Sequence, residues 1–210
     1  MARLRSGILG NVRGKVAGVV GSQWKDKNYV REYVLPANPN TASQQVQRGK
    51  MQDVVAFCKS LVGPVFNSYT DKFQKSMSGF NFFIKHGIAE FDGSPTYANL
   101  KLTEGKLYPI QSLVVEYAED SELTGATWDE AIGNNGALTD KVYGALYDTA
   151  KELWYFPAAE VTRDDELITF AVPDDSNATD LECWVWAIAY SGTLVSMLSN
   201  SAHSQAVNPA

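Results

Sequence analysis

Histidine and cysteine, the side chains that most often carry acid–base, nucleophilic or metal chemistry, are scarce in this sequence. The two histidines are His86 and His203, and the two cysteines are Cys58 and Cys183. A general base at neutral pH or a zinc site needs such a side chain beside a partner. The histidines fall in different predicted domains, and no H-x-x-x-H, C-x-x-C or G-x-S-x-G spacing occurs. The sequence therefore predicts a protein that is not an enzyme, with no catalytic, metal-binding or cofactor-binding residues.

The remaining chemical motifs are weak. The stretch from Gly10 to Lys15 has three residues between its glycines, where a phosphate-binding loop needs four, and Val16 follows the lysine. Acidic clusters lack the ligand spacing of a calcium loop, so we expect them to be solvated turns. They are Glu119-Asp120, Asp129-Glu130, Asp164-Asp165-Glu166 and Asp174-Asp175. Both cysteines lie in apolar patterns, which predicts buried thiols and no disulfide framework.

The elements that organise the chain meet at a proline-containing stretch. Pro36 and Pro39 favour an extended backbone and disfavour helix at the residue before each. Thr41 stands three residues before Gln44, the spacing of a capping box, in which the threonine oxygen accepts a backbone N–H. Apolar residues then recur at helix spacing. We predict a helix of about five turns that begins after Thr41 and ends at Gly63-Pro64.

Residues 1–35 carry glycines at positions 7, 10, 14, 18 and 21. The spacing would suit one face of a helix, but each glycine would destabilise that helix by roughly 0.8–1 kcal/mol. The intervening valines prefer strands. We therefore predict extended segments in which backbones approach closely, followed by a hairpin that turns near Asp26-Lys27-Asn28.

A change of period divides the rest of the chain. A short helix is predicted from Ser78 to Gly87, with neighbouring aromatic residues packed on the first helix. Residues 92–108 look loop-like, and the apolar period becomes two from Pro109. Candidate strands are Ile110–Ala118, Lys141–Tyr147, Glu152–Phe156, Leu167–Val172, Leu181–Tyr190 and Leu194–Ser204. Such strands favour a β-sandwich. The predicted fold is α+β: a basic extended arm and helical region (1–108), then an immunoglobulin- or fibronectin-like antiparallel sandwich (109–210).

Charge is divided unevenly along the chain, although the total is −6. Residues 1–50 hold nine Lys/Arg and two acids, a net +7, and the remainder holds nine Lys/Arg and 22 acids, a net −13. A basic arm on an acidic body suits nucleic acid, an acidic surface, or the body of a neighbouring copy. Nucleic acid is the least favoured of these, because the acidic body would repel phosphates. No secretory leader or apolar run of membrane length is seen, so no membrane partner is expected.

Several short patterns follow one another in a recognisable order. The spaced glycines run into Trp24-Lys25, then come Val30-Arg31, Asn38-Pro39-Asn40-Thr41 with Gln44 and Arg48, and finally Ser199-Asn200-Ser201. In this order they resemble an uncharacterised family of bacterial and phage proteins with a β-rich C-terminal domain. The string Asn-Pro-x-Thr-x-x-Gln-x-x-x-Arg is also similar to one in phage virion proteins. The resemblance implies a virion structural protein and assigns no catalytic residue.

We therefore expect a non-enzymatic structural subunit of a bacteriophage virion, part of its head (capsid), neck or tail. It would be made in the host cytoplasm and assemble with copies of itself and other virion proteins through its basic arm. The residues expected at the assembly interface are Arg3, Arg5, Arg13, Lys15, Trp24, Arg31, Asn38, Thr41, Gln44 and Arg48. The alternative is an adhesion module whose sandwich binds glycan or protein through aromatic residues such as Trp128, Trp154 and Tyr155.

Overall fold

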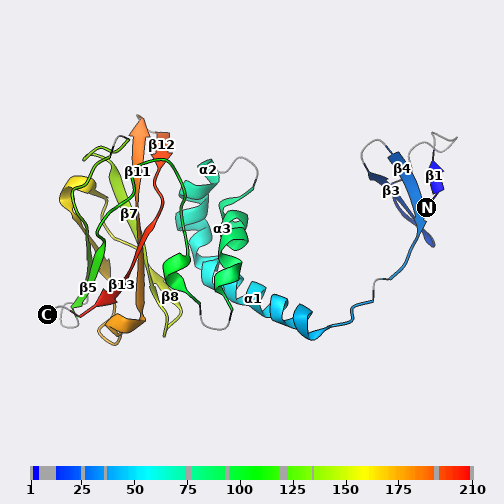
Figure 1. Cartoon of the computed structure of the whole chain (residues 1–210), viewed down its shortest axis with the longest axis horizontal. Helices are drawn as coiled ribbons and strands as arrows, with labels where there is room; N and C mark the ends of the chain where they lie inside the picture. Colours follow the sequence, from blue (N-terminus) through cyan, green and yellow to red (C-terminus); the bar gives the residue numbers. More distant parts are fainter. Residues whose placement is uncertain are drawn as a thin grey trace. The chain divides into compact units, whose positions relative to one another are not determined.

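The computed structural model of the chain (Figure 1) describes residues 2–4, 13–24, 27–35, 37–73, 77–92, 95–118, 123–133, 135–191 and 194–208. For residues 2–4, 24, 73, 118 and 194 it describes the backbone alone. The chain forms two compact units, Met1–Ala42 and Ser43–Ala210. Helices and strands are both present, so the predicted α+β class is confirmed.

The N-terminal unit is a four-stranded antiparallel sheet in the order β1-β4-β3-β2. Its strands are β1 Ala2–Leu4, β2 Gly14–Val16, β3 Val19–Trp24 and β4 Lys27–Glu32. β3 and β4 pair from Val19 opposite Glu32 to Trp24 opposite Lys27. The pairing of the predicted hairpin is therefore confirmed, but Lys27 and Asn28 belong to β4 rather than to the turn, and Asp26 lies outside the described residues. Of the described glycines in the glycine-spaced stretch, Gly14 and Gly21 are in strands and Gly18 is in a turn.

Helical segments open the C-terminal unit. They are α1 Ala42–Cys58, a 3-10 turn Lys59–Leu61, a π-helical segment Val62–Thr70, α2 Asp71–Phe73, α3 Gly79–Gly87, and 3-10 turns Ile88–Glu90 and Tyr97–Asn99. The prediction that Gly63-Pro64 ends the first helix is wrong. Pro64 lies in the first turn of the π-helical segment, where a missing N–H leaves no bond unmade. α3 matches the short helix that was predicted from Ser78 to Gly87. Ser78 caps its N-terminus, where the Ser78 hydroxyl accepts a hydrogen bond from the Asn81 N–H (3.3 Å).

Nine strands complete this unit: β5 Val114–Ala118, β6 Leu123–Thr127, β7 Lys141–Asp148, β8 Leu153–Tyr155, β9 Val161–Thr162, β10 Leu167–Ala171, β11 Leu181–Ser191, β12 Leu194–Leu198 and β13 Ala202–Val207. Two 3-10 turns, Arg163–Asp165 and Ala178–Asp180, lie between them. The strands join in one path, β10-β6-β5-β13-β11-β7-β8, with β12 also on β11 and β9 on β7. The single strand predicted at Leu194–Ser204 is two strands, and β6 and β9 were not predicted.

The strands form a single sheet that is barrel-like. β13 links two parts of the strand path, because residues 202–205 pair with β11 and residues 206–207 run parallel to β5. β10 contacts β7 across the interior: a Cβ built on Gly144 would lie 2.7 Å from Cζ of Phe170. The core enclosed by the sheet contains Val115, Phe170 and Val185. Its apolar contacts hold the sheet in this curved form.

The helical segments cover the outer face of the β11–β7 part of the sheet (Figure 1). Alternation along β11 explains this, because Trp184, Trp186 and Ile188 point away from the core that Cys183, Val185 and Ala187 enter. Phe57 of α1 packs in this second core, with its ring centroid 6.1 Å from that of Trp184. Aromatic residues 65–91 thus pack on the sheet as well as on α1.

This shared core explains where the compact units separate. The sequence predicted a boundary at residues 108/109, whereas the units meet at Ala42/Ser43. The helical region is not a separate domain, because its apolar side chains are buried against β7 and β11. The exposed polar and glycine-containing sequence of residues 92–108 resembled a linker, but the segment is fixed to the sheet, as shown below.

Both thiols are buried without a disulfide, as predicted. Burial raises the pKa of Cys58 to about 12 and raises the pKa of Cys183 as well. Because the thiolate is the reactive form, we expect neither thiol to react with Ellman's reagent in the native protein at about pH 8. Both should react once guanidinium unfolds the chain. Rapid release of colour from the native protein would contradict this burial.

Candidate interaction sites

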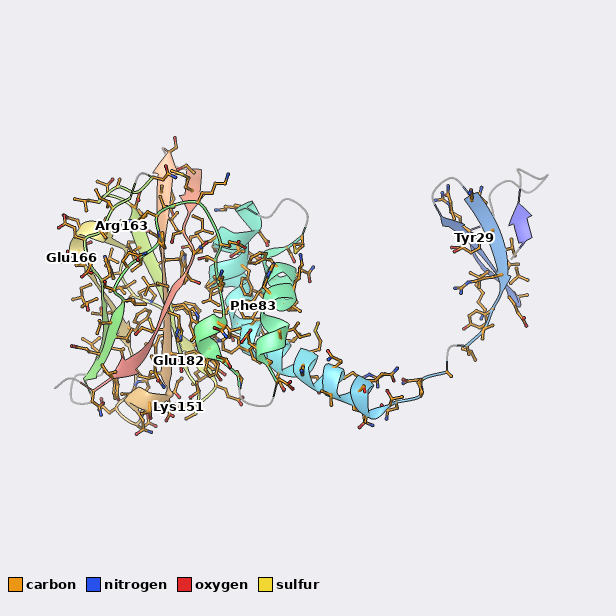
Figure 2. The ribbon with its side chains drawn as sticks, in the orientation of Figure 1. Tyr29, Phe83, Lys151, Arg163, Glu166 and Glu182 are labelled. Carbon is orange, nitrogen blue, oxygen red and sulfur yellow. The ribbon has the colours of Figure 1, made fainter. Side chains whose placement is uncertain are left out.

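The N-terminal sheet carries its basic residues on one face. Lys15 lies opposite Val20, which lies opposite Arg31, and alternate residues of a strand share a face. Lys15, Lys27, Tyr29 and Arg31 therefore lie together, and we call them the basic face (Tyr29 is labelled in Figure 2). The Nζ of Lys15 stands 3.6 Å from the centroid of the Tyr33 ring, a cation–π contact.

The opposite face of this sheet combines exposed valines with polar side chains. Val16 lies opposite Val19, and Val19 lies opposite Glu32. Val16 is 63% exposed and Val19 is 44% exposed. Among the described residues of this unit, Gly21 alone is buried. The described residues of the sheet therefore leave these two valines uncovered.

The predicted interface residues fall on two elements. On or beside the strands of the sheet lie Arg3, Arg13, Lys15, Trp24 and Arg31. On the segment leading into α1 and on its first turns lie Asn38, Thr41, Gln44 and Arg48, all exposed. The guanidinium of Arg13 donates to the side chain of Gln23. Arg5 lies outside the described residues.

A clamp fixes residues 102–107 to the segment Leu198–Ser201. Its hydrogen bonds run from Leu102 N–H to Ser201 Oγ (3.0 Å), Thr103 Oγ1 to the Ser199 carbonyl (2.9 Å), Gly105 N–H to Asn200 Oδ1 (3.0 Å) and Leu107 N–H to the Leu198 carbonyl (3.0 Å). Ser199 Oγ also accepts the Ala187 N–H (2.8 Å), which ties the clamp to β11. Gly105 is essential here, since a Cβ would lie 1.8 Å from the Leu198 carbonyl oxygen.

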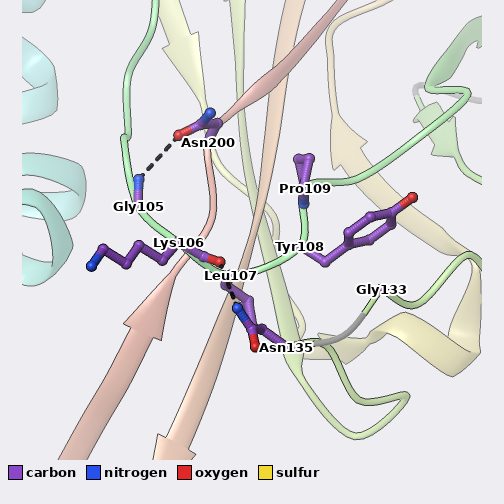
Figure 3. Close-up of a pocket in the computed structure, with 8 residues that line it drawn as sticks. All are labelled: Gly105, Lys106, Leu107, Tyr108, Pro109, Gly133, Asn135 and Asn200. Atoms are coloured by element: carbon purple, nitrogen blue, oxygen red, sulfur yellow. Dashed lines mark hydrogen bonds between the residues drawn. The ribbon is translucent and has the colours of Figure 1, made fainter.

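A cavity of about 490 Å³ lies beside this clamp (Figure 3). Its walls include Lys106, Tyr108, Asn135 and Asn200. Asn200 Oδ1 is already bonded within the clamp, and Asn135 Nδ2 is 3.5 Å from the Lys106 carbonyl. One polar atom of each of these two amides is therefore used to hold the backbone around the cavity.

The backbone carbonyl of Tyr108 is held by a residue of a buried ion pair. Arg163 is buried; its guanidinium donates to the Tyr108 carbonyl, and its Nε lies 3.4 Å from Asp140 Oδ2. The Nε–H lacks hydrogen-bonding geometry to that oxygen, so this contact is electrostatic. Burial lowers the pKa of Arg163 from its ordinary value, while the charge of Asp140 opposes the shift. The pair joins residue 108 to the β9–β10 connection.

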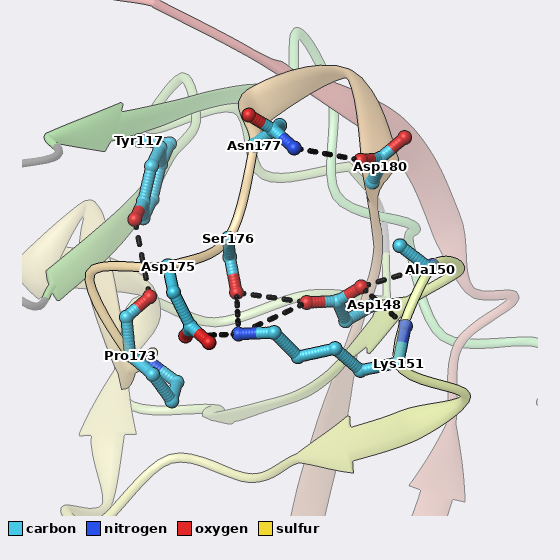
Figure 4. Close-up of polar contacts among 9 residues, drawn as sticks. All are labelled: Tyr117, Asp148, Ala150, Lys151, Pro173, Asp175, Ser176, Asn177 and Asp180. Carbon is cyan, nitrogen blue, oxygen red and sulfur yellow. Dashed lines mark hydrogen bonds and ion pairs between the residues drawn. The ribbon is translucent and has the colours of Figure 1, made fainter.

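A second polar cluster surrounds Asp148, at the end of β7 (Figure 4). Asp148 is fully buried; its Oδ1 accepts the N–H groups of Ala150 and Lys151 (3.0 Å each), and its Oδ2 accepts Ser176 Oγ–H (2.8 Å). Lys151 Nζ lies 4.0 Å from this carboxylate and pairs with exposed Asp175. Each partner is a group of the fold itself, so the cluster positions the turn after β7.

The tryptophans of the alternative hypothesis are held by packing. Trp128 is buried, and its indole N–H donates to the Arg163 carbonyl (3.1 Å). Trp154 donates its N–H to the Phe57 carbonyl (2.9 Å) and packs in the second core. These contacts leave neither indole N–H for a glycan.

The histidines do not share a site. His203 Nε2 lies 2.6 Å from a Glu182 carboxylate oxygen beside Trp184, whereas His86 packs on Phe82 in the last turn of α3. Over the ranges the structure describes, no group of three or more His, Cys, Asp or Glu side chains could hold a metal ion. No helix in those ranges is long and apolar enough to cross a membrane.

A family model, "Family of unknown function (DUF6266)", matches residues 11–203. The chain belongs to this family. The match covers β2 to β12, the clamp and the first two residues of β13, and the predicted membership of an uncharacterised family is confirmed. Searches of curated proteins and of solved structures found no match. The link to phage particles stays a prediction.

Proposed function

We propose that this protein is a non-enzymatic structural subunit that assembles through its N-terminal sheet. The observation that carries the proposal is the exposure of two neighbouring valines, Val16 and Val19, on one face of that sheet. A small sheet needs a packed face to be stable in water, because apolar burial provides the main stabilisation. Val16 and Val19 leave such a face exposed. A second surface that covers it would stabilise both the sheet and the assembly.

Charge indicates what the covering surface is. Residues 1–42 hold seven Lys/Arg and two acids, a net +5, and residues 43–210 hold eleven Lys/Arg and 22 acids, a net −11. The N-terminal unit of one copy therefore attracts the C-terminal unit of another. The same −11 would weaken binding to nucleic acid, so copies of this chain are the preferred partners.

The proposed particle is a bacteriophage virion, in its head, neck or tail. The support is the resemblance of Asn38-Pro39-Asn40-Thr41, Gln44 and Arg48 to a string in phage virion proteins. In such a particle the chain would contact further virion proteins as well as its own copies.

We further propose that the strands form an immunoglobulin-like sandwich with a helical cover. The order β10-β6-β5 in one layer and β13-β11-β7 in the other corresponds to strands E-B-A and G-F-C of that fold. The parallel contact of β5 with β13 joins the layers at one edge. An experimental structure with β10 paired to β7 rather than to β6 would contradict this assignment.

Light scattering tests the assembly. We expect the full chain to form defined oligomers at tens of micromolar. The triple variant Lys15→Glu, Lys27→Glu and Arg31→Glu should dissociate, because it removes the attraction between the basic face and the acidic unit. The matched control, Lys59→Glu, Lys72→Glu and Lys85→Glu, changes the net charge equally at exposed helical positions and should remain assembled. A monomeric full chain would refute the proposal.

A further inference from the structure

A small aromatic pocket lies where the π-helical segment meets the outer face of β7 and β11. Its volume is about 140 Å³, and its walls include Pro64, Tyr69, Tyr143, Phe156, Pro157 and Trp186. The Tyr69 ring lies 5.2 Å from the Tyr143 ring and 5.9 Å from the Trp186 ring, centroid to centroid. Phe156 is 36% exposed, so this wall of the pocket is reached from solvent.

One wall of this aromatic pocket contains an unused hydrogen-bond donor. Trp186 is 1% exposed, and its Nε1–H has no partner among the described residues. A buried donor without a partner destabilises the folded protein, because it has lost its hydrogen bond to water. Trp128, Trp154 and Trp184 each donate to a backbone carbonyl, so Trp186 differs from them. An acceptor such as a peptide carbonyl would supply the missing bond once a ligand opens the pocket.

The chemistry of the pocket walls favours a neutral ligand. Burial raises the pKa of Tyr69 to about 12 and raises the pKa of Tyr143 as well, so both hydroxyls stay protonated near neutral pH. Glu160, which accepts the Tyr143 hydroxyl (3.3 Å), is already paired with Lys141. Aromatic and proline walls with a free indole N–H match the grooves that bind proline-containing extended peptides.

The chain itself contains such a peptide. Pro36-Ala37-Asn38-Pro39 has the P-x-x-P spacing, which places both prolines on one edge of a polyproline II helix. Residues 37–41 form neither helix nor strand, and the preceding Leu35 is exposed. We propose that the aromatic pocket binds the segment Pro36–Pro39 of a second copy. This rests on the proposed function, because it names the acceptor site for one part of the assembly arm.

Chain length restricts binding of this segment to the pocket of its own copy. α1 spans about 24 Å from Ala42 to Cys58 at its usual rise per residue, and the helical run continues beyond it to Pro64. Pro39 reaches at most about 10 Å back from Ala42, and Pro36 at most about 21 Å. A segment folded back along its own α1 would therefore stop short of the pocket. A neighbouring copy has no such restriction.

Peptide binding tests the proposal. The receptor is the full chain carrying Pro36→Ala and Pro39→Ala, so that its own segment does not compete. The probe is a fluorescent peptide of residues 33–41, and the control peptide has alanine at both proline positions. We expect saturable anisotropy for the probe and at least tenfold weaker binding of the control. Equal binding of both peptides, or no binding to a receptor with native circular dichroism, would overturn the proposal.

Receptor variants locate the binding site. Trp186→Phe keeps an aromatic ring but removes the N–H and should weaken binding at least fivefold. Phe156→Ala removes an exposed wall without opening the core and should do the same, even if Trp186→Phe does not fold. Trp154→Phe, outside the pocket, is the matched control and should bind normally. Unchanged binding in both pocket variants would overturn the assignment of this site.

Light scattering of the double proline variant separates this inference from the proposed function. Weaker assembly together with peptide binding supports both. Unchanged oligomers without peptide binding would refute the pocket and leave the assembly proposal standing. A monomeric wild-type chain that binds the peptide would refute the assembly proposal and, with it, the second copy as the occupant.

Discussion

Replacing Gly105 with alanine is expected to destabilise the C-terminal unit by roughly 3 kcal/mol, measured as a lower urea midpoint. The new Cβ would overlap the Leu198 carbonyl oxygen, which already accepts the Leu107 N–H. The backbone would have to move away, and the clamp hydrogen bonds of Thr103 and Gly105 would stretch or break. Because these bonds tie the segment to β11 through Ser199, the loss extends to the sheet.

Gly49→Ala is the matched control for this substitution. A Cβ at Gly49 meets nothing within 4 Å, and the residue lies within α1. We expect its free energy of unfolding to change by less than about 1 kcal/mol, toward greater stability. If the two alanine variants unfolded at the same urea concentration, the clamp as described would be wrong.

Asp148→Ala is expected to cost about 3–5 kcal/mol, because it removes a buried charge and leaves its partners unpaired. The amides of Ala150 and Lys151 and the hydroxyl of Ser176 would each lose an acceptor (Figure 4). The measurement is again the free energy of unfolding in urea. The turn after β7 should also exchange its amide hydrogens faster.

Asp175→Ala provides the contrast within the same cluster. The Asp175 side chain is 78% exposed and pairs with Lys151, as Asp148 does. Exposed pairs contribute less than about 1 kcal/mol, so this variant should be close to wild type. If both variants lost the same free energy of unfolding, burial would not be the reason that Asp148 stabilises the protein.

The sequence predicted the elements with strong local patterns. β11 follows from a nearly continuous apolar run that ends at a turn, and α3 from a serine cap before an aromatic run. β6 was missed because Leu-Thr-Gly-Ala-Thr is short, contains Gly125 and is weakly apolar. β9 has two residues, too few for a period. Periodicity identifies an element only where several residues repeat it.

Side-chain partners distant in sequence could not be predicted. Ser199-Asn200-Ser201 stood out as a pattern, but its role depends on residues 102–107, almost 100 positions earlier. Gly105 looked like a linker glycine, but the Leu198 carbonyl lies so close that no side chain fits at this position. Arg163 and Asp148 gave no signal, because isolated charges are usually solvated. The Trp186 donor was likewise invisible, since only packing shows which indole lacks an acceptor.

The two halves of the helix–sheet core lie far apart in the sequence, so they are synthesised at different times. Phe57, Phe66 and Phe83 are translated long before β11 delivers Trp184 and Trp186 to cover them. Contacts between such distant residues form slowly, and uncovered aromatic surface promotes aggregation in the meantime. The nascent chain is therefore expected to need a chaperone until residue 188 has left the ribosome. The late synthesis of β11 would also postpone the proposed assembly of copies until the C-terminal unit is complete.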